Sequence, residues 1–245
     1  MIIGLIPSRL NSKRLKEKPL LEIDGLPIIV HTYKRAKLCK KLDDVIVCAD
    51  DKKIIDVVHK HGGKAILTSK KHKNGTERIF EVAKKIKKAK LIIDIQGDEP
   101  LVDPSDIDQV IKFHSRNKQF DIVVPCMIAQ ENITSKNLVK VIFSNNGKIL
   151  YFSRAKIPFD YKEKKIKYYR DLSIVSFKPN ALKKYSQMKE GFLEKAEGIE
   201  LIRAIENNLN LGTFIAVGSG FAVDVNQDLM KAIDIMPRDK IRKRY

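Results

Sequence analysis

The feature of this sequence that most restricts its fold is an alternation of short β-branched runs with longer amphipathic stretches. The short runs are IIGLI at 2–6, VIVCA at 45–49, KAILT at 64–68 and LIIDIQG at 91–97. The stretches between them, at 27–42, 52–62 and 76–89, repeat an apolar residue every three or four positions, which is typical of helices with one buried face. This order predicts the α/β class, with a mostly parallel, doubly wound sheet that carries helices on both faces.

The pattern changes beyond Pro104. One helix is predicted at 103–117, and strands are predicted at 121–129, 138–144 and 148–153. Asn145, Asn146 and Gly147 favour a hairpin turn between the last two strands, which are therefore expected to pair antiparallel. Residues 158–170 have no clear period and are predicted to form a loop or an extension.

The C-terminal part contains further helical and strand-like segments. We predict a helix at 194–208, a strand at 213–218, a helix after Asp224 and a frayed basic tail at 238–245. The whole chain, 1–245, is expected to be a single domain, with a core of 1–120 and 171–245 and a smaller antiparallel region at 121–170.

Composition restricts the location of the chain. No apolar run reaches the ~20 residues that cross a bilayer, and Pro7 and Arg9 interrupt the first apolar run too early for a signal peptide. The cysteines, Cys39, Cys48 and Cys126, are odd in number and far apart, which favours reduced thiols over disulfides or a zinc site. We therefore expect a cytoplasmic protein.

The formal charge of +18 fits a nucleic acid, an anionic membrane surface or a polyanionic small substrate. It does not choose among them, because lysines occur along most of the chain and a scattered excess usually marks a solvated surface.

The first strand runs into a basic loop, IPSRLNSKRLKEKPL, at what should be the carboxyl edge of the sheet, where open α/β sheets bind ligands. Its cations are Arg9, Lys13, Arg14, Lys16 and Lys18. Arg can grip phosphate oxygens in pairs and Lys supplies a point charge, so the loop suits a triphosphate. It is neither a dinucleotide GxGxxG motif nor a Walker loop, and an ordinary basic surface loop is the alternative.

A second polar segment, IIDIQGDEP at 92–100, ends a buried strand with Gln96, Gly97, Asp98 and Glu99. Magnesium takes one or two carboxylates together with water and phosphate oxygens, so Asp98 is a candidate ligand. Asp94, two residues back in the strand, should point the same way as Gln96 and could support it by a hydrogen bond. The alternative is that the acidic residues only form a turn.

A third segment, HKNGTERI, offers Thr76 as a candidate helix cap and Glu77 as its capping partner. Arg78 also lies near the helix start, where the dipole repels a cation, so it is expected to serve an anion or a base edge. None of the five histidines occurs in a triad-like context.

Taken together, several segments resemble the 3-deoxy-manno-octulosonate cytidylyltransferases, in order along nearly the whole chain. They are the basic loop, the region 50–83, IQGDEPLVDP, LVKVI, YFSRAKIP, LEKAEGIELIRAIE and DVNQDL. The resemblance implies a homodimeric, CTP-dependent enzyme that joins CMP to the anomeric hydroxyl of an acidic sugar. It makes 1–120 and 171–245 a nucleotide-binding core and 121–170 a dimerisation and acceptor region.

The resemblance also implies roles for individual residues. Those implied on the phosphates are Arg9, Ser12 and Lys18, and those implied around the cytidine are Thr76, Arg78 and Gln96. Magnesium would be bound by Asp98 and Asp224, and the catalytic residues would be Arg9, Lys18 and Asp98. The residues implied at the acidic sugar are Lys140, Arg154, Asp171 and Glu200.

The chain departs from the family pattern mainly on the sugar side. Asp171, Ser173 and Val175 stand where the family has His, Gly and Tyr, and Leu201 replaces a Gln. The Thr, Pro and Glu of the family's last motif are also replaced, although Asp224 is kept. These departures leave open another acid sugar, sialic-acid-like or amino-octulosonate, and a non-catalytic relative. From a different class, a basic nucleic-acid-binding protein remains an alternative, against which no recognition motif is present.

Overall fold

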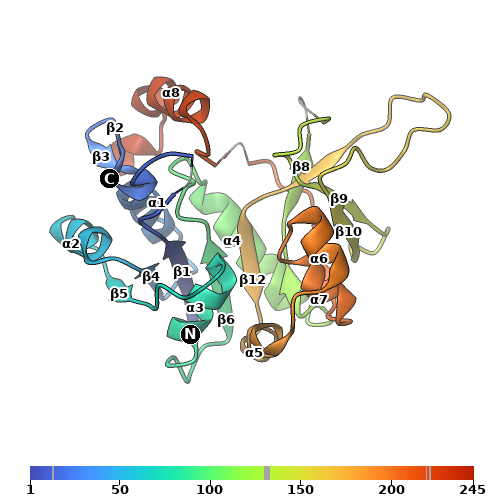
Figure 1. The fold of residues 1–245 in the computed structure, drawn as a ribbon, viewed down its shortest axis with the longest axis horizontal. Helices are drawn as coiled ribbons and strands as arrows, with labels where there is room; N and C mark the ends of the chain where they lie inside the picture. The colour runs from blue at the N-terminus through green and yellow to red at the C-terminus, as the bar shows by residue number, and fades with distance from the viewer. Residues whose placement is uncertain (13, 130–132, 219, 221) are drawn as a thin grey trace.

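The computed structural model describes residues 1–12, 14–129, 133–218, 220 and 222–245. Within them, the main sheet has seven strands in the order β13-β7-β12-β6-β1-β4-β5 (Figure 1). Their bounds are Ile2–Ser8 (β1), Asp44–Ala49 (β4), Ala65–Leu67 (β5), Leu91–Ile95 (β6), Ile122–Val123 (β7), Ile174–Phe177 (β12) and Leu211–Gly212 (β13). All neighbours pair parallel except β12, which is antiparallel to both β6 and β7. The mostly parallel sheet predicted from the sequence is confirmed.

Helices cover both faces of this sheet. One face packs against α1 (Ile28–Lys37), α2 (Lys52–Lys60) and α4 (Pro104–Arg116). The other packs against α3 (Gly75–Ala83), α5 (Pro179–Gln187) and the short α7 (Ile202–Glu206), with α6 (Phe192–Glu197) next to α7. Alternate β6 residues face the two layers, Ile92 toward α3 and Ile93 toward α1 and α4. The sheet is therefore doubly wound.

Side-chain caps fix the starts of three helices. Asp51, Asn74 and Asp103 accept hydrogen bonds from backbone N–H groups in the first turns of α2, α3 and α4. The cap predicted at Thr76 is therefore wrong, because Asn74 caps α3 and Thr76 lies inside the helix.

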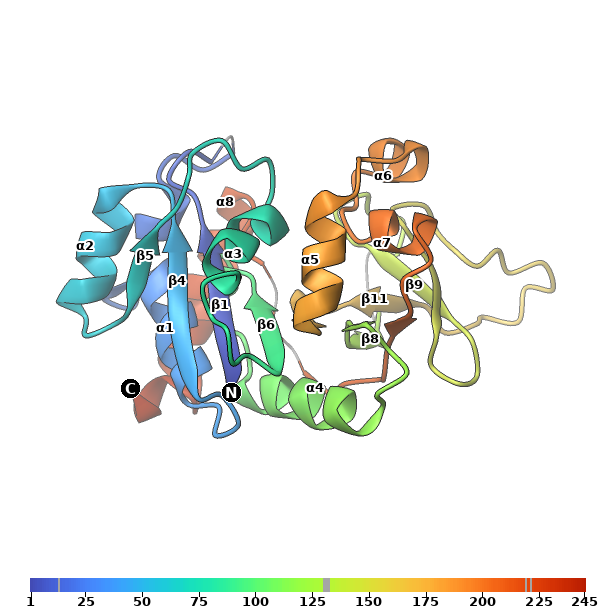
Figure 2. The ribbon, with the colours of Figure 1, turned by 90° about the horizontal axis from the view of Figure 1, so that it is seen from below.

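A second, four-stranded antiparallel sheet lies at the end of the molecule away from α2 (Figures 1 and 2). It consists of β8 (Cys126–Ile128), β9 (Lys140–Phe143), β10 (Ile149–Ser153) and β11 (Tyr169–Asp171), in the order β10-β9-β11-β8. The β9–β10 hairpin is as predicted, with Gly147 at a φ of +78°. The segment between β10 and β11 projects from this end as an extended arm (Figure 1).

Three predicted segments differ in the structure. The strand predicted at 121–129 is interrupted at Pro125, and its halves join different sheets as β7 and β8. The helix predicted at 194–208 divides at Gly198, whose φ of +61° ends α6. Of the strand predicted at 213–218, only an isolated bridge between Ile215 and Cys126 forms. The residue after this segment, 219, lies outside the described part of the chain.

The C-terminal tail predicted to fray is packed against the body. The helix predicted after Asp224 is present as α8 (Asn226–Ile235), which the 3-10 turn η2 (Met236–Arg238) follows, and the tail itself contains the 3-10 turn η3 (Arg242–Arg244). The Tyr245 hydroxyl lies 3.2 Å from Nε of Arg35 and 2.8 Å from Nδ1 of His31. Arg242 pairs with Asp24 at 2.7 Å, beside the small hairpin of β2 (Glu22–Ile23) and β3 (Leu26–Pro27). Among the described residues, the helices include none that combines the length and apolar character needed to span a bilayer.

Candidate active site

A cavity of about 390 Å³ opens where the carboxyl ends of β1 and β6 meet. It is lined by the basic loop, the start of α3, the turn after β6 and single residues from α7's leading turn and the segment before α8. The lining residues are Pro7, Ser8, Arg9, Ser12, Arg14, Lys18, Pro19, His72, Lys73, Asn74, Gly75, Arg78, Gln96, Gly97, Asp98, Glu200 and Asp224. This is the edge at which open α/β sheets bind ligands.

The turn after β6 approaches β1 so closely that only glycine fits. A Cβ on Gly97 would lie 2.6 Å from the Pro7 carbonyl oxygen. The absence of a side chain lets Gln96 and Asp98 face the cavity from either side of this contact.

Lys18 joins three segments of the chain at the cavity. The residue begins the 3-10 turn η1 (Lys18–Leu20), and its ammonium lies 2.7 Å from Asp98 and 3.3 Å from Asp224. Arg14 pairs with the same Asp224 oxygen at 2.7 Å but is half exposed. Arg9 and Ser12 line the cavity, whereas Lys16 is exposed outside it and Lys13 lies outside the described residues.

The two carboxylates are also joined through the backbone. The Val223 N–H donates to the Asp98 carbonyl oxygen at 2.9 Å. Asp228 accepts from the N–H groups of Asp224 and Val225 at 2.9 and 3.0 Å, which fixes the segment before α8. Among the described residues there is no cluster of three or more acidic, His or Cys side chains suited to a metal ion. A pair of carboxylates with space for water and phosphate beside it is a donor set that suits magnesium.

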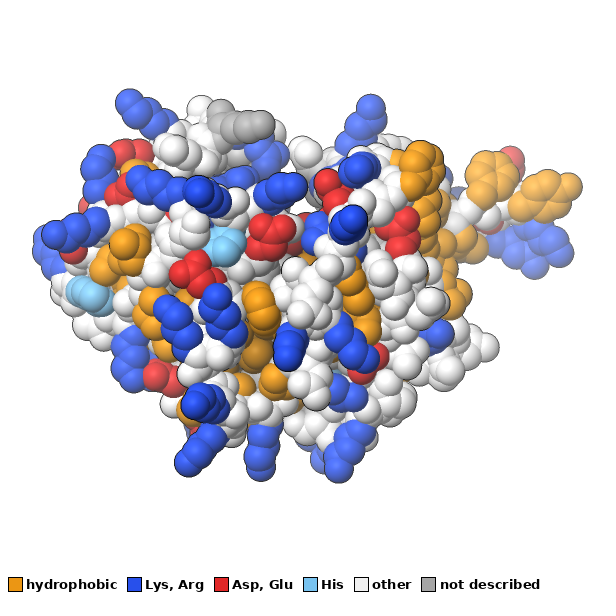
Figure 3. Space-filling view, turned by 60° about the horizontal axis from the view of Figure 1, so that its bottom comes forward, with side chains coloured by type: hydrophobic (Ala, Val, Ile, Leu, Met, Phe, Trp, Pro, Cys, Tyr) orange, Lys and Arg blue, Asp and Glu red, His pale blue; other side chains and the backbone are white. Residues whose placement is uncertain are grey.

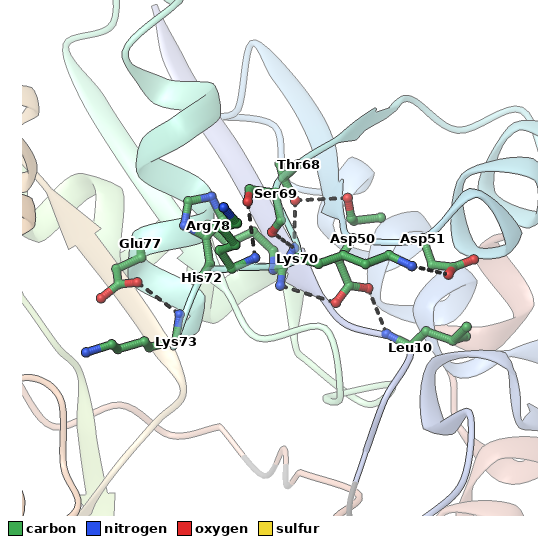
Figure 4. Close-up of polar contacts among 12 residues, drawn as sticks. Leu10, Asp50, Asp51, Thr68, Ser69, Lys70, His72, Lys73, Glu77 and Arg78 are labelled. Atoms are coloured by element: carbon green, nitrogen blue, oxygen red, sulfur yellow. Dashed lines mark hydrogen bonds and ion pairs between the residues drawn. The ribbon is translucent and has the colours of Figure 1, made fainter.

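Arg78 lines the cavity, but its side chain is largely buried and bound by other residues of the protein. Its Nη1 donates to Thr68 at 2.7 Å, and its Nη2 pairs with Asp50 at 3.3 Å (Figure 4). Asp50 also accepts from the Leu10 N–H at 2.9 Å, so one carboxylate connects α3 to the basic loop. Burial lowers the pKa of Arg78, an effect that the Asp50 carboxylate opposes. The anion that Arg78 was predicted to bind is thus supplied in part by the protein itself, as the Asp50 carboxylate.

Glu200 borders two adjoining cavities. Its carboxylate accepts from the Thr76 hydroxyl at 2.9 Å, and burial raises its pKa. It lines the first cavity and a second one of about 560 Å³, which Lys73 and Asn74 also line. Thr76 itself lines neither cavity and is connected to them through Glu200.

The other residues predicted on the sugar side are not brought into either cavity. Lys140 is buried, and its ammonium donates to the carbonyl oxygens of Ser135, Leu138 and Arg154, which uses all three of its hydrogens. Arg154 likewise donates to three backbone carbonyl oxygens, those of Lys136, Glu197 and Gly198.

Asp171 ends β11 and lines neither cavity. Burial raises its pKa to about 6, although Arg170 beside it lowers the pKa in part. Of the residues predicted on the sugar side, Glu200 is therefore the one that lines these two cavities.

Four residues of the site were not predicted from the sequence. His72, Lys73 and Asn74 line the cavity from the start of the HKNGTERI segment, where no role was predicted for them, and His72 is held by Glu81 at 2.6 Å. Asp50 follows β4 at its carboxyl end, so the edge rule applied to Asp98 could have indicated it.

Comparison with known proteins agrees with this geometry. The family model for cytidylyltransferases matches residues 3–211. The 3-deoxy-manno-octulosonate cytidylyltransferase of Fusobacterium nucleatum is 37% identical over 98% of both chains. That of Escherichia coli is 34% identical over 96% of both. A solved structure of CMP:2-keto-3-deoxy-manno-octonic acid synthetase with CTP superposes with a TM-score of 0.93, at 33% identity, over 97% of this chain and 98% of that one.

This chain belongs to the 3-deoxy-manno-octulosonate cytidylyltransferase family. It is accordingly a CTP-dependent cytidylyltransferase, as the resemblance implied. The fold class and the enzyme class predicted from the sequence are confirmed, and the basic nucleic-acid-binding alternative is not supported. In keeping with this, Figure 3 shows Lys and Arg side chains spread over the visible face rather than gathered in one stripe.

Proposed function

We propose that this chain transfers CMP from CTP to the anomeric hydroxyl of 3-deoxy-manno-octulosonate and releases pyrophosphate. The observation that carries the proposal is the meeting of Lys18 with Asp98 and Asp224 in one cavity. It combines a phosphate-binding cation with two carboxylates that suit a divalent ion. The relatives of matching length carry this activity in their names.

In the proposed reaction the sugar's anomeric oxygen attacks the α-phosphorus of CTP in line with the departing pyrophosphate. The protein takes little covalent part in this reaction, so it acts mainly by positioning the reactants and neutralising charge. Arg9, exposed at the cavity, and Lys18, 13% exposed within it, would neutralise the charge that develops on phosphate oxygens. Ser12 would hold the phosphates from the same loop.

Magnesium is the cofactor that we propose, held by Asp98 and Asp224. It would supply charge neutralisation at the phosphates and a lower pKa for the attacking hydroxyl. Lys18 keeps the two carboxylates close together by lying between them, which reduces their mutual repulsion and their repulsion of the triphosphate.

On the nucleotide side, Gln96 and Arg78 would contact the cytidine, with Thr76 acting through Glu200. On the acceptor side we propose Glu200 as the direct contact, since it faces both cavities. Lys140 and Arg154 would act by holding the loops around that side. Asp171 lies outside both cavities, so its carboxylate adds no charge to them, which favours the ordinary acid over an amino-substituted one.

A homodimer and a cytoplasmic location complete the proposal, with 1–245 acting as one catalytic domain. The projecting arm carries Phe159 and Tyr161, whose side chains are 84% and 85% exposed, and Figure 3 shows apolar side chains on this projection. Exposed aromatic groups of this kind mark interaction surfaces, and dimers with two-fold symmetry are the commonest assemblies.

The direct test is an assay of pyrophosphate release with CTP, magnesium and 3-deoxy-manno-octulosonate, with the CMP-sugar identified by mass spectrometry. Sialic acid and the amino-octulosonate are run in parallel. We expect turnover with the ordinary acid and its loss in Asp98→Asn, which removes an anionic ligand but keeps the size of the side chain. Preference for another acid, or a normal rate in Asp98→Asn at saturating magnesium, would contradict the corresponding part of the proposal.

A further inference from the structure

Asp94 is a buried carboxyl group without a cationic partner, one layer behind the cavity. It lies in β6 between Leu5 of β1 and Val175 of β12, and it is 1% exposed. Glu200 and Asp98 are the charged groups that act on it most, and both are acidic. A buried carboxyl group with no compensating cation costs folding free energy, so a role in the site would account for its presence.

The contact that Asp94 makes is with Gln96. Nε2 of Gln96 lies 3.2 Å from Oδ1 of Asp94, as expected for alternate residues on one face of a strand. In this arrangement the amide nitrogen donates to the carboxyl group, as it must when that group is the acceptor, because the nitrogen is a donor and the amide oxygen only an acceptor. A proton on Asp94 would reside on Oδ2, which has no partner in the described residues, and would leave Oδ1 an acceptor.

The opposite end of the amide is open to the cavity. Gln96 lines the cavity, and its Oε1 has no hydrogen-bond partner among the residues that the structure describes. It is not among the enclosed polar atoms that lack a partner, so it is accessible. The carboxylates of Glu200 and Asp98 line the same cavity, and this wall therefore presents acceptors.

We infer that Asp94 is a positioning residue that turns the Gln96 oxygen into the cavity and so makes this wall select a hydrogen-bond donor on the substrate. The donor is the exocyclic amine of cytosine, which uracil replaces with a carbonyl oxygen, or a hydroxyl group of the acceptor sugar. A site built to pair with a donor strongly rejects an analogue that lacks it. This inference rests on the proposed function and adds to it the residue that sets this preference.

The test replaces Asp94 with groups that keep or remove its acceptor. Asp94→Leu leaves the Gln96 amide free to turn its NH₂ group into the cavity, and Asp94→Val, which suits a buried strand, takes its place if the leucine variant does not fold. Asp94→Asn keeps an acceptor oxygen at the same position. Asp106→Asn, a change of another buried carboxyl that lines neither cavity, is the matched control.

Two quantities are measured on each folded variant. The first is the preference for CTP over UTP, given as the CTP:UTP ratio of the equilibrium binding constants and of the kcat/KM values. The second is the KM of the acceptor. A fall of about tenfold or more in the CTP:UTP ratio of Asp94→Leu supports the inference with the base amine as the donor. An unchanged ratio with an acceptor KM raised about tenfold supports it with the sugar hydroxyl as the donor. Asp94→Asn should stay within about threefold of the unmodified protein in both.

Three results would overturn the inference. They are a folded Asp94→Leu that matches the unmodified protein in both quantities, an Asp94→Asn as impaired as Asp94→Leu, and a Gln96→Met that changes neither quantity. Failure of the unmodified protein to turn over CTP would instead refute the proposed function, so the two failures are distinguishable.

Discussion

Glu99 should make the stability of this protein fall as the pH rises through neutrality. The residue is 3% exposed, and burial raises the pKa of its carboxyl group from 4.5 to about 7. Since the folded state holds this proton more tightly than the unfolded state, the free energy of unfolding decreases between pH 4.5 and pH 7. The shift corresponds to about 3 kcal/mol in all, of which about 2.5 kcal/mol falls between pH 5 and pH 8.

Glu99→Gln removes this titration and keeps the shape of the side chain. We expect the free energy of unfolding of the variant, relative to the unmodified protein, to rise by about 2.5 kcal/mol from pH 5 to pH 8. Urea denaturation at several pH values measures the difference, in which the other titrating groups cancel where they do not interact with Glu99. Glu190→Gln, at an exposed position, should give a flat difference. A flat difference for Glu99→Gln as well would show that this carboxyl group titrates normally despite its burial.

Three further changes test other parts of the structure. Lys18→Met should lower kcat by about 10² to 10³, because it removes a charge aimed at the phosphates. Steady-state rates measured beside an exposed control, Lys53→Met, test this, and a loss below tenfold would refute the role of Lys18 at the phosphates. Arg203→Met should destabilise the fold by about 3–5 kcal/mol, since it leaves buried Glu194 without its partner at 2.6 Å. Thermal unfolding of the double variant with Glu194→Leu should recover most of the lost stability. A loss of stability that persists in the double variant would argue against the ion pair as its cause. Phe159→Ser should weaken the proposed dimer, so light scattering at micromolar concentration should show more monomer, whereas a monomer in the unmodified protein would refute the dimer itself.

The parts of the fold that the sequence predicts are those with strong local periodicity. The strands β1, β4 and β6 follow from short apolar runs, and the helices between them follow from apolar residues that recur at helical spacing. The interruption at Pro125 was not predicted, because the apolar residues on its two sides suit either sheet, and their separation depends on tertiary pairing. The packed tail was missed for a similar reason, since Arg242 and Tyr245 are contacted by groups distant in the sequence, Asp24 and Arg35.

The candidate site shows the same division. Arg9, Lys18, Gln96, Asp98 and Asp224 follow strand ends or family segments and meet in one cavity. Lys140 and Arg154, which resemble sugar ligands in sequence, are used to bind backbone carbonyl groups. No local pattern distinguishes a cation that faces a substrate from one that faces its own chain, because the difference is the direction of a long side chain.

The contacts of the Tyr245 hydroxyl form a hydrogen-bond chain that can run in only one direction. Nε of Arg35 is always a donor and the carbonyl oxygen of Ile23, 2.6 Å from Nε2 of His31, is always an acceptor. When the imidazole is neutral, its proton therefore lies on Nε2 and the hydroxyl gives its proton to Nδ1 of His31. Burial lowers the pKa of His31 to about 4, so this chain of donors keeps its polarity throughout the neutral range and the tail stays attached to the hairpin before α1 without responding to ordinary changes of pH.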